Sequence, residues 1–597
     1  MNKDQLRTSQ LITTFGPGAM VDLPDASIIV GGLDHWNYDP SHIPTISEER
    51  LTAKMRLVLG RNTSMLRRPP PASDVPQGIH PDIVGWRFPE WFIVQNTVPV
   101  KGGIRRRRLV HLNSLDSGKF REDDGKRYGV VPVRFVRACK RGHIGDIDWK
   151  AFVHGAGAAC ARSLWIEERG TSGDLDEIWI VCECGKERVM SQAARQELKA
   201  LGNCNGSRPW LGRGTRESCG IPNRLLIRSA SNAYFPQLMS VISIPDARTP
   251  VDDVVRSAWD AGLSIVDSPE KLAMVRQIPN LAAKLQGLDD DAVWASISRV
   301  RAGSDNIDRP VKEVEFDALS SAAEELGSDV PNGDFFARRL APTLWQAPWM
   351  APIERVILVH RLREVVALLG FTRFEAAGPD INGELELDVE RAPLAIDTSW
   401  LPAAENLGEG IFLLFNKDAI AAWLGRPAVE ARARQLSTGF ELWKKDHDAS
   451  RRLFPGAPYY MLHSLSHLLI TAISLECGYP ASSLRERIYA APGRYGVLIY
   501  TGSSDAEGTL GGLVESGREI RKHMRRALDI AVLCANDPVC AHHYPAEHDH
   551  QPLLGSACHG CLLIAETSCE QHNDFLDRGC LVPTVEGSGA EFFTSAS

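Results

Sequence analysis

ACHGCLLIAETSCE, residues 557–570, places Cys558, Cys561 and Cys569 within one short stretch. A disulfide, a redox pair, a catalytic nucleophile or a metal site would each use such thiols. A redox pair needs a thioredoxin-like βαβ setting, which this sequence does not indicate. A nucleophile is one cysteine paired with a histidine, whereas here several thiols cluster. The stretch therefore favours a metal site, and ligation of a metal decides how such a segment folds.

The cysteines around this stretch supply enough sulfur for a closed zinc shell. Cys534 and Cys540 flank a turn, Cys558 and Cys561 form a C-x2-C pair that can reach one ion, and Cys569 follows. Four sulfurs leave no position for water, which is typical of a structural zinc ion. Five cysteines compete for four positions, and the sequence leaves open which one is excluded.

Composition predicts a soluble multidomain protein. The 597 residues are 44% hydrophobic and 24% charged, which supports several cores and suggests roughly three to five domains. The N-terminus lacks a basic-then-apolar signal pattern, and His463 and His467 interrupt the longest apolar stretch, so we expect a cytoplasmic protein with no membrane association. A reducing compartment disfavours disulfides, and thirteen cysteines, an odd number, cannot all pair.

Six further cysteines lie between positions 139 and 219 and predict a second zinc-binding region. Thiolates and imidazoles are the ligands of tetrahedral zinc, and neighbouring glycines let the backbone turn around an ion. One grouping is a four-sulfur site made of Cys182, Cys184, Cys204 and Cys219. A second site, or alternatives to the first, would use Cys139, His143, His154 and Cys160. Buried cysteines without a metal are the alternative. We expect one or two structural zinc ions in the whole chain.

The remaining segments mix strand and helix patterns. Residues 176–184 (DEIWIVCEC), 410–415 (GIFLLF) and 496–502 (GVLIYTG) are typical of strands. Residues 351–370 and 419–436 have apolar residues at helical spacing and predict helices. The fold class is therefore α+β, multidomain, with two cysteine-rich zinc-binding regions and a more helical C-terminal half.

Two basic segments stand out in a chain whose net charge is -8. That charge excludes a generally basic nucleic-acid binder, since phosphate affinity depends on Lys and Arg. One segment is the run Arg105, Arg106, Arg107 and Arg108, which would contact nucleic acid or an acidic partner surface. The other predicts a helix with Ile520, Met524 and Leu528 on its buried face. Its basic residues, on the other faces, are Arg518, Arg521, Lys522, Arg525 and Arg526. A solvated face without a partner is the alternative.

No complete catalytic constellation is evident. The phosphate-binding motif G-x4-GK[ST] is missing, and the glycine-rich residues 508–517 (GTLGGLVESG) favour a turn packed closely against a strand. His463 and His467 lie one helical turn apart, but without the glutamate of H-E-x-x-H, so they predict hydrogen-bonded core. Asp505 and Glu507 follow a strand and give a weak indication of a metal-dependent nuclease.

Several motifs, in one order, resemble the DrmB family of the DISARM bacterial anti-phage defence system. They are RTSQLITTFGPGAMVDLPDASIIVGGLDHW, CKRGHIGDIDW, SNAYFP, HSLSHLLI, GVLIYTGSSDAEGTLGGLV and ACHGCLLIAETSCEQHNDFLDR. The resemblance runs nearly end to end, from Arg7 to Arg578. It implies a partner, a DrmA-like superfamily 2 helicase, within a complex that binds DNA.

The resemblance also implies a helicase-associated C-terminal domain with a four-cysteine zinc site. Matching that pattern points to Cys534, Cys540, Cys561 and Cys569, with Cys558 as the substitute. It assigns no catalytic residue.

The expected domains follow from these patterns. They are residues 1–125, an N-terminal domain; 126–245, a cysteine-rich zinc-binding region; 246–350, a mainly helical region; 351–455, an α+β middle domain; and 456–597, the helicase-associated domain with the second cysteine cluster. We expect a non-catalytic accessory subunit that forms a heterodimer with the helicase and supports its engagement of foreign DNA. A metal-dependent nuclease and an autoinhibitory regulator of the helicase are the alternatives.

Overall fold

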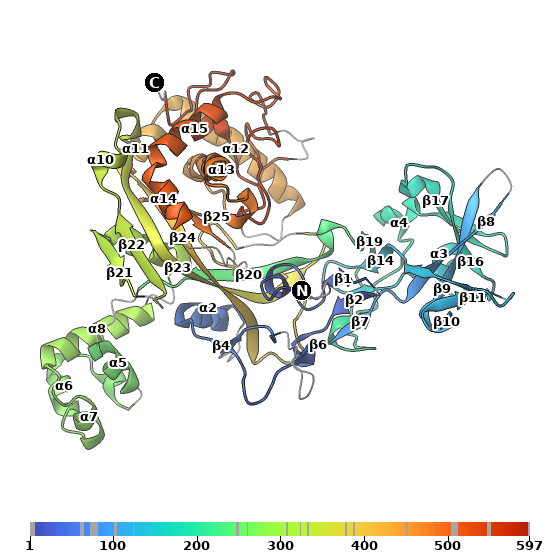
Figure 1. The fold of residues 1–597 in the computed structure, drawn as a ribbon, viewed down its shortest axis with the longest axis horizontal. Coiled ribbons are helices and arrows are strands. Elements are labelled where there is room, and N and C mark those ends of the chain that lie inside the picture. The colour runs from blue at the N-terminus through green and yellow to red at the C-terminus, as the bar shows by residue number, and fades with distance from the viewer. Residues whose placement is uncertain are drawn as a thin grey trace.

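The chain folds as an α+β protein built around long strands, as the sequence predicted (Figure 1). A computed structural model describes residues 6–594 except for a set of short segments. The segments outside the description are 25, 60–64, 72–81, 101–103, 123, 246–249, 260, 306–308, 323, 331–332, 376–378, 386–388, 448–451, 503–510 and 546–550. The longest helices lie in the C-terminal half, which confirms the predicted distribution.

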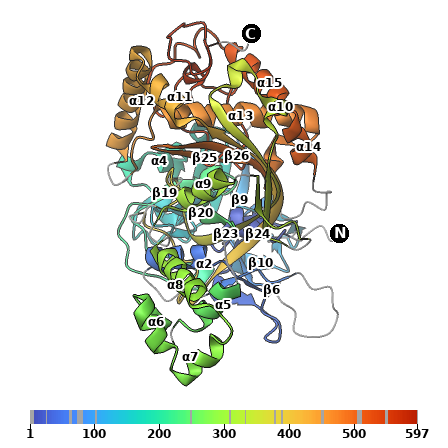
Figure 2. The same cartoon turned by 90° about the vertical axis from the view of Figure 1, so that its left-hand side faces the viewer.

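An antiparallel pair of long strands, β23 (Ile353–Thr372) and β24 (Trp400–Phe415), runs through the centre of the molecule (Figures 1 and 2). Its two ends belong to different hydrophobic cores. Val356 lies opposite Leu413 in the C-terminal core, and Val366 lies opposite Ala404 in the N-terminal core. The pair therefore joins the two halves of the molecule through backbone pairing, with an irregularity between Val359 and Leu362.

The helix predicted at 351–370 is wrong, because this segment forms β23. Its second half is buried at consecutive positions, and an apolar run of that kind fits a buried strand as well as a helix. Its many Val and Ile residues favour the strand, since β-branched side chains pack well on a pleated surface. Pairing decides the outcome, because β24 lies on one edge of β23 and β20 (Phe235–Ile242) and β22 (Phe335–Arg339) lie on the other.

The central sheet has nine strands, most of them antiparallel. The order β21-β22-β23-β24-β26-β25 forms its main path, with β20 beside β23 and the short strands β4 and β5 beside the start of β24. The strands not yet located are β21 (Glu325–Gly327), β25 (Leu484–Ala491), β26 (Arg494–Thr501), β4 (Thr45–Ile46) and β5 (Met65–Arg67). The strands predicted at 410–415 and 496–502 fall within β24 and β26, so both predictions are confirmed.

Helices of the C-terminal half cover one face of this sheet (Figure 2). The central helix is α13 (Ala457–Cys477), which packs on β25, β26 and α15 (Ile520–Val532) and is buried along most of its length. The helical pattern at 419–436 is confirmed, but as two helices, α11 (Lys417–Leu424) and α12 (Pro427–Asp446), because Pro427 starts a new helix. Among the described helices, none combines the length and apolarity needed to cross a bilayer.

A separate lobe at the right of Figure 1 carries the first cysteine cluster. It contains a six-stranded sheet of order β13-β8-β9-β16-β17-β18 and a small sheet of order β15-β14-β19. The strands that position functional residues are β9 (Arg105–His111), β14 (Phe135–Ala138), β15 (Ile144–Gly145), β17 (Ile178–Cys182) and β18 (Glu187–Val189). The strand predicted at 176–184 corresponds to β17 and is confirmed.

A small helical lobe lies below the central sheet in both views (Figures 1 and 2). It consists of α5 (Pro250–Ser257), α6 (Pro269–Val275), α7 (Pro279–Lys284) and α8 (Asp290–Asp305) and has its own core. These helices lie inside the predicted helical region 246–350, whose later residues also supply β21 and β22. The domain boundaries themselves stay predictions.

A buried carboxylate fastens the C-terminal helices to the central sheet. Glu409 of β24 is 1% exposed and accepts hydrogen bonds from the main-chain amides of Gly511 (2.8 Å), Leu513 (2.7 Å) and Val514 (3.2 Å). These amides begin α14 (Gly512–Arg518), where helix geometry leaves N–H groups without intrahelical acceptors. The turn predicted at 508–517 is only partly right, because Gly512 to Gly517 belong to α14, and residues 508–510 lie outside the described residues. The predicted close packing is present, since Gly517 lies against Leu358 of β23 and Ile411 of β24.

We predict that Glu409→Ala loosens α14. Removing the carboxylate leaves three buried amides without an acceptor, which costs about 2–4 kcal/mol of local stability. Hydrogen exchange followed by mass spectrometry should show peptides that cover 511–518 exchanging at least about tenfold faster. Glu430→Ala is the control, because that side chain is 71% exposed on α12 and should leave exchange in 511–518 unchanged. Equal exchange in both variants would contradict the assignment.

Candidate metal centres

All thirteen cysteines are free thiols, and eleven of them belong to compact groups of metal-ligand side chains. In each group the ligand atoms lie within 4.8 Å of one another. The four groups are Cys534/Cys540/Cys558/Cys561, Cys139/His143/Cys204/Cys219, His154/Cys160/Cys182/Cys184 and His463/His467/Glu486/Cys569. The two remaining cysteines, Cys477 and Cys580, lie outside all four.

Sulfur separations in these groups fit a shared zinc ion and exclude disulfides. Cys534 and Cys558 lie 3.4 Å apart, Cys540 and Cys561 3.7 Å, and Cys558 and Cys561 3.8 Å. A disulfide joins sulfurs at about 2.05 Å. Two sulfurs at ~2.3 Å from one tetrahedral zinc lie about 3.8 Å apart. The observed spacing therefore matches ligands around one ion.

The C-terminal group forms where α15 ends and the chain becomes irregular. Cys534 follows the helix, Cys540 lies after a short turn, and Cys558 and Cys561 form the C-x2-C pair. Main-chain amides donate to three of the sulfurs, from Asn536 to Cys534 (3.4 Å), from Gly560 to Cys558 (3.3 Å) and from Cys558 to Cys561 (3.3 Å). Such amides stabilise thiolate charge in the shell around a metal.

The ligand set implied by the resemblance needs one correction. Cys558 lies within the four-sulfur group, whereas Cys569 lies in another group beside His463 and His467. Sequence spacing could not decide this, because both Cys558 and Cys569 lie within a few residues of Cys561. The fold carries Cys569 back under β25, away from the other sulfurs.

Charge in the C-terminal group is concentrated on one thiolate. Hydrogen bonding from Cys561, together with the nearby Arg578 guanidinium, lowers the pKa of Cys540 to about 6. The same interaction raises the pKa of Cys561, since it is the partner that keeps the proton. At neutral pH a thiolate is therefore ready to take up a cation, and binding would displace the remaining thiol protons.

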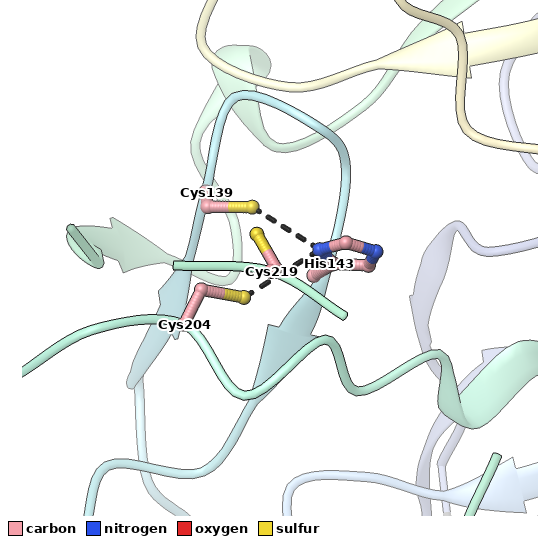
Figure 3. Close-up of side chains that lie close together, drawn as sticks. All are labelled: Cys139, His143, Cys204 and Cys219. Atoms are coloured by element: carbon pink, nitrogen blue, oxygen red, sulfur yellow. Dashed lines mark hydrogen bonds between the residues drawn. The ribbon is translucent and has the colours of Figure 1, made fainter. Parts of the chain in front are cut away.

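A second group forms beside the small sheet and is shown in Figure 3. Cys139 and His143 flank the turn between β14 and β15, where Gly142 has φ +82° and allows the tight reversal. The His143 Nδ1 atom lies 3.4 Å from the Cys139 sulfur and 3.5 Å from the Cys204 sulfur. Cys219 completes the group from an irregular segment.

An outer carboxylate orients the histidine of this group. The Nε2 atom of His143 lies 2.7 Å from the Glu217 carboxylate, which also accepts a 2.9 Å hydrogen bond from Arg208. Holding the proton on Nε2 leaves the Nδ1 lone pair directed at the sulfurs, the arrangement of carboxylate–histidine–zinc sites. Hydrogen bonding from Cys139 and from His143 lowers the pKa of Cys204 to about 4, so this thiolate is charged at neutral pH.

A third group lies at one end of the six-stranded sheet. His154 ends α3 (Trp149–His154), Cys182 ends β17, and Cys184 lies in the turn before β18. Cys160 is 3.7 Å from Cys182, sulfur to sulfur. Burial raises the pKa of Cys182 to about 11, whereas a main-chain amide lowers that of the exposed Cys184. The buried His154 Nε2 has no hydrogen-bond partner among the described residues, which suits a metal ligand.

The predicted four-sulfur site of the first cluster is therefore wrong in its grouping. Cys182 and Cys184 lie with His154 and Cys160, whereas Cys204 and Cys219 lie with Cys139 and His143. The β17–β18 turn and the β14–β15 turn belong to different sheets, so cysteines that follow one another in the sequence are sorted into two sites. Each of the six cysteines between positions 139 and 219 nevertheless lies in one of these two groups.

The two histidines of HSLSH are buried and hydrogen-bonded, as predicted. His463 and His467 are both 0% exposed and face Glu486 of β25, which the sequence did not identify. Burial alone would raise the pKa of Glu486, but the two imidazoles hold it well below its ordinary value. The i, i+4 spacing of the two histidines was the signal in the sequence. Their carboxylate partner could not be recognised there, because Glu486 lies outside the motif, on β25.

The basic helix is confirmed as α15. Ile520, Met524 and Leu528 are buried, and the exposed face carries Arg521, Lys522, Arg525 and Arg526, with Arg518 in the preceding α14. Some of this charge is compensated, since Lys522 (2.8 Å) and Arg526 (3.0 Å) bind Glu476 and Arg518 binds Glu515 (3.0 Å). Arg521 has no carboxylate within ion-pair distance among the described residues.

The four arginines of β9 are largely engaged within their own lobe. Arg106 lies over the Trp165 ring at 4.4 Å, Arg107 binds Glu168 at 2.8 Å, and Arg108 donates to Ser163 at 2.7 Å. Arg105 is exposed. The run is therefore a weaker contact surface than α15. Asp505 and Glu507, the nuclease candidates, lie outside the described residues.

We predict that Cys558→Ser with Cys561→Ser removes one zinc ion per chain. The two sulfurs belong to one four-sulfur group, so their loss leaves two ligands, which hold zinc poorly. Plasma mass spectrometry of the purified chain should register the loss, and hydrogen exchange should rise in 534–562 but not in 139–219. Cys477→Ser, outside every group, should keep the full zinc content. Unchanged zinc in the double variant would refute the site.

Comparison with known proteins agrees with these features. Residues 7–235 match a domain of unknown function (DUF8724), and residues 465–562 match the MrfA Zn-binding domain, which contains Cys534, Cys540, Cys558 and Cys561. The chain is 32% identical over 537 residues to the DISARM protein DrmB of Bacillus paralicheniformis, across 87% of this chain and 92% of that relative. The chain therefore belongs, as its motifs predicted, to the DrmB family of DISARM proteins.

Proposed function

We propose that the chain is a non-catalytic accessory subunit of an anti-phage defence complex, in which it partners a superfamily 2 helicase and supports its engagement of foreign DNA. The observation that carries the proposal is the similarity to a DISARM protein DrmB, which extends over 87% of the chain. Similarity of that extent includes the central sheet, the cysteine-rich lobe and the C-terminal helices together. The proposed role therefore concerns the whole chain.

The α15 surface supports contact with nucleic acid. Arg521, Lys522, Arg525 and Arg526 are exposed on one side of a helix whose opposite side is anchored in the C-terminal core. A rigid helix that presents cations can replace condensed counterions along a phosphate backbone. Arg521 and Arg525 are the strongest candidates, because Glu476 already compensates the other two cations.

The C-terminal zinc segment supports contact with a protein partner. Next to the four-sulfur group, Leu533 is 67% exposed and Val539 is 79% exposed. Large aliphatic side chains held outward on a metal-fixed loop are suited to burial against another chain. In this arrangement zinc would fix the loop, α15 would reach the DNA, and the partner would supply ATP hydrolysis.

We expect the chain to change the ATPase rate of its partner helicase on DNA while hydrolysing no ATP alone. The measurement compares helicase with and without the chain on free-ended, circular and single-stranded DNA. A DNA-dependent change together with co-elution supports the accessory role. Its sign separates a loader from an autoinhibitory regulator. No change together with failure to co-elute would overturn the proposal.

Charge reversal on α15 should weaken DNA binding by the complex. The triple variant Arg521→Glu, Arg525→Glu, Arg526→Glu is expected to lower affinity and to reduce the slope of log K against log salt by up to about 3, or roughly 0.9 for each lost phosphate contact. Fluorescence anisotropy over a salt series measures both quantities. Arg434→Glu, on the exposed side of α12, is the control for net charge. An unchanged slope would exclude α15 from the DNA path.

A further inference from the structure

Four ligand side chains converge beneath β25, at a distance from the cysteine-rich centres in the sequence. His463 and His467 come from α13, Glu486 from β25 and Cys569 from the irregular C-terminal segment. The Glu486 Oε1 atom lies 2.8 Å from His463 Nε2 and 3.3 Å from His467 Nε2, and the Cys569 sulfur lies 3.2 Å from His463 Nε2. All four side chains are buried.

The hydrogen bonds fix which ring nitrogens carry protons. His463 Nδ1 faces the Phe575 carbonyl at 3.3 Å, and His467 Nδ1 faces the Leu562 carbonyl at 2.8 Å. Carbonyl oxygens accept and never donate, so each Nδ1 is the protonated nitrogen. In neutral rings both Nε2 lone pairs then point at the Glu486 carboxylate oxygen, where they repel it. A cation between them, or a second proton on each ring, would remove that repulsion.

A divalent cation is compatible with the charge of this site. One imidazolium would balance the Glu486 carboxylate, whereas a second imidazolium would leave uncompensated positive charge where His463 and His467 are 0% exposed. The nearby Glu570 does not offset this charge, because its carboxylate is paired with Lys312 at 2.7 Å. Two neutral imidazoles, one carboxylate and one thiolate carry two negative charges, which a divalent ion neutralises.

The sulfur of Cys569 receives two main-chain hydrogen bonds. It accepts main-chain N–H groups from Gln571 (3.4 Å) and Asn573 (3.1 Å). Two such donors stabilise a thiolate in the manner of metal-bound sulfur. The second carboxylate oxygen of Glu486 accepts the Ser466 hydroxyl, which leaves Oε1 directed at the histidines.

The ligand set identifies the ion. Two nitrogens, one oxygen and one sulfur at tetrahedral spacing suit zinc, whereas calcium and magnesium require oxygen ligands. Around zinc, neighbouring N and O ligands lie about 3.4 Å apart. The 3.3 Å between Glu486 Oε1 and His467 Nε2 matches this spacing, and the 2.8 Å to His463 Nε2 would have to lengthen around an ion. The i, i+4 histidines on α13 place both Nε2 atoms on the same side of the helix.

The centre lies against a cavity with both apolar and charged lining residues. Residues 566–572, which include Cys569, form a continuous wall of a cavity of about 390 Å³. Lys312, Glu364, Arg485, Arg487 and Tyr500 line its other sides. Arg485 and Arg487 flank Glu486 on β25, so the strand that carries one ligand also presents two cations to the cavity.

We propose that His463, His467, Glu486 and Cys569 bind a fourth zinc ion, which fixes the 566–572 wall of this cavity. The site is separate from the four-sulfur group of the Zn-binding domain, whose match spans 465–562 and excludes both His463 and Cys569. It is also independent of the accessory role, because metal binding here requires neither helicase nor DNA.

Anomalous diffraction from crystals of the full chain, measured on both sides of the zinc absorption edge, tests the site directly. A peak among the four side chains supports the proposal. Peaks confined to the three cysteine-rich groups would overturn it. Because the wild-type chain is used, the result does not depend on whether any variant folds.

Metal content of variants gives a second test. Plasma mass spectrometry should find four zinc ions per wild-type chain and three in Cys569→Ser and in His467→Gln. Cys580→Ser is the matched control, since Cys580 is also fully buried in the same part of the chain but belongs to no group, and it should retain four. Equal zinc in Cys569→Ser, His467→Gln and wild type would contradict the ligand assignment.

Hydrogen exchange tests the link to the cavity wall. Peptides covering 566–572 should exchange at least tenfold faster in Cys569→Ser and His467→Gln than in the Cys580→Ser control. Loss of one zinc without faster exchange of this segment would refute the claim that the ion fixes the wall.

Discussion

Backbone pairing between β23 and β24 is the constraint on which the molecule depends. The two strands pair from Ile353 opposite Phe415 to Ala367 opposite Ala403, and their two ends enter separate cores. Pairing along both ends satisfies the amides and carbonyls that would otherwise be buried without partners in each core. The N-terminal elements and the C-terminal helices are thus both placed by one pair of strands. The position of α14 also depends on β24, because Glu409 of that strand accepts three main-chain hydrogen bonds from the start of the helix.

Clustered metal-ligand side chains and buried polar contacts supplement the core where regular structure ends. Between α15 and residue 594, the described residues form one short 3-10 turn, η11 (Arg578–Cys580), and otherwise irregular chain. Buried polar contacts hold part of this segment: Asp577 accepts from Arg432 (2.7 Å) and from the Ser556 (3.0 Å) and Gly579 (2.9 Å) amides. The four-sulfur group supplies the remaining cross-links. Apolar side chains such as Leu562, Leu576 and Phe592 also anchor this irregular segment in the C-terminal core, so the four-sulfur group adds to core packing.

The candidate functional surfaces are consequences of this arrangement. The basic face of α15 is exposed because Ile520, Met524 and Leu528 fix the opposite face in the C-terminal core. The zinc segment follows directly from the end of that helix, so a metal-fixed loop and a basic helix form one rigid unit. The arginine run of β9 differs, since a central position in a sheet engages three of its side chains with Trp165, Glu168 and Ser163. Clustered arginines are therefore exposed on α15, whereas those of β9 mostly contact side chains of their own lobe.

The sequence by itself determined which two regions are rich in metal-ligand cysteines, the amphipathic helix at 520–532, the α+β class and the family. Ligand chemistry, helical periodicity and ordered motifs are local properties that any fold must preserve. Tertiary structure alone decided that 351–370 is a strand, because a continuous apolar run is compatible with both structures until neighbouring strands pair with it. It also decided the ligand partners: Cys569 joins His463, His467 and Glu486, and Cys182 separates from Cys204. Metal coordination depends on distances in space, and chain spacing fixes those distances only within a single turn.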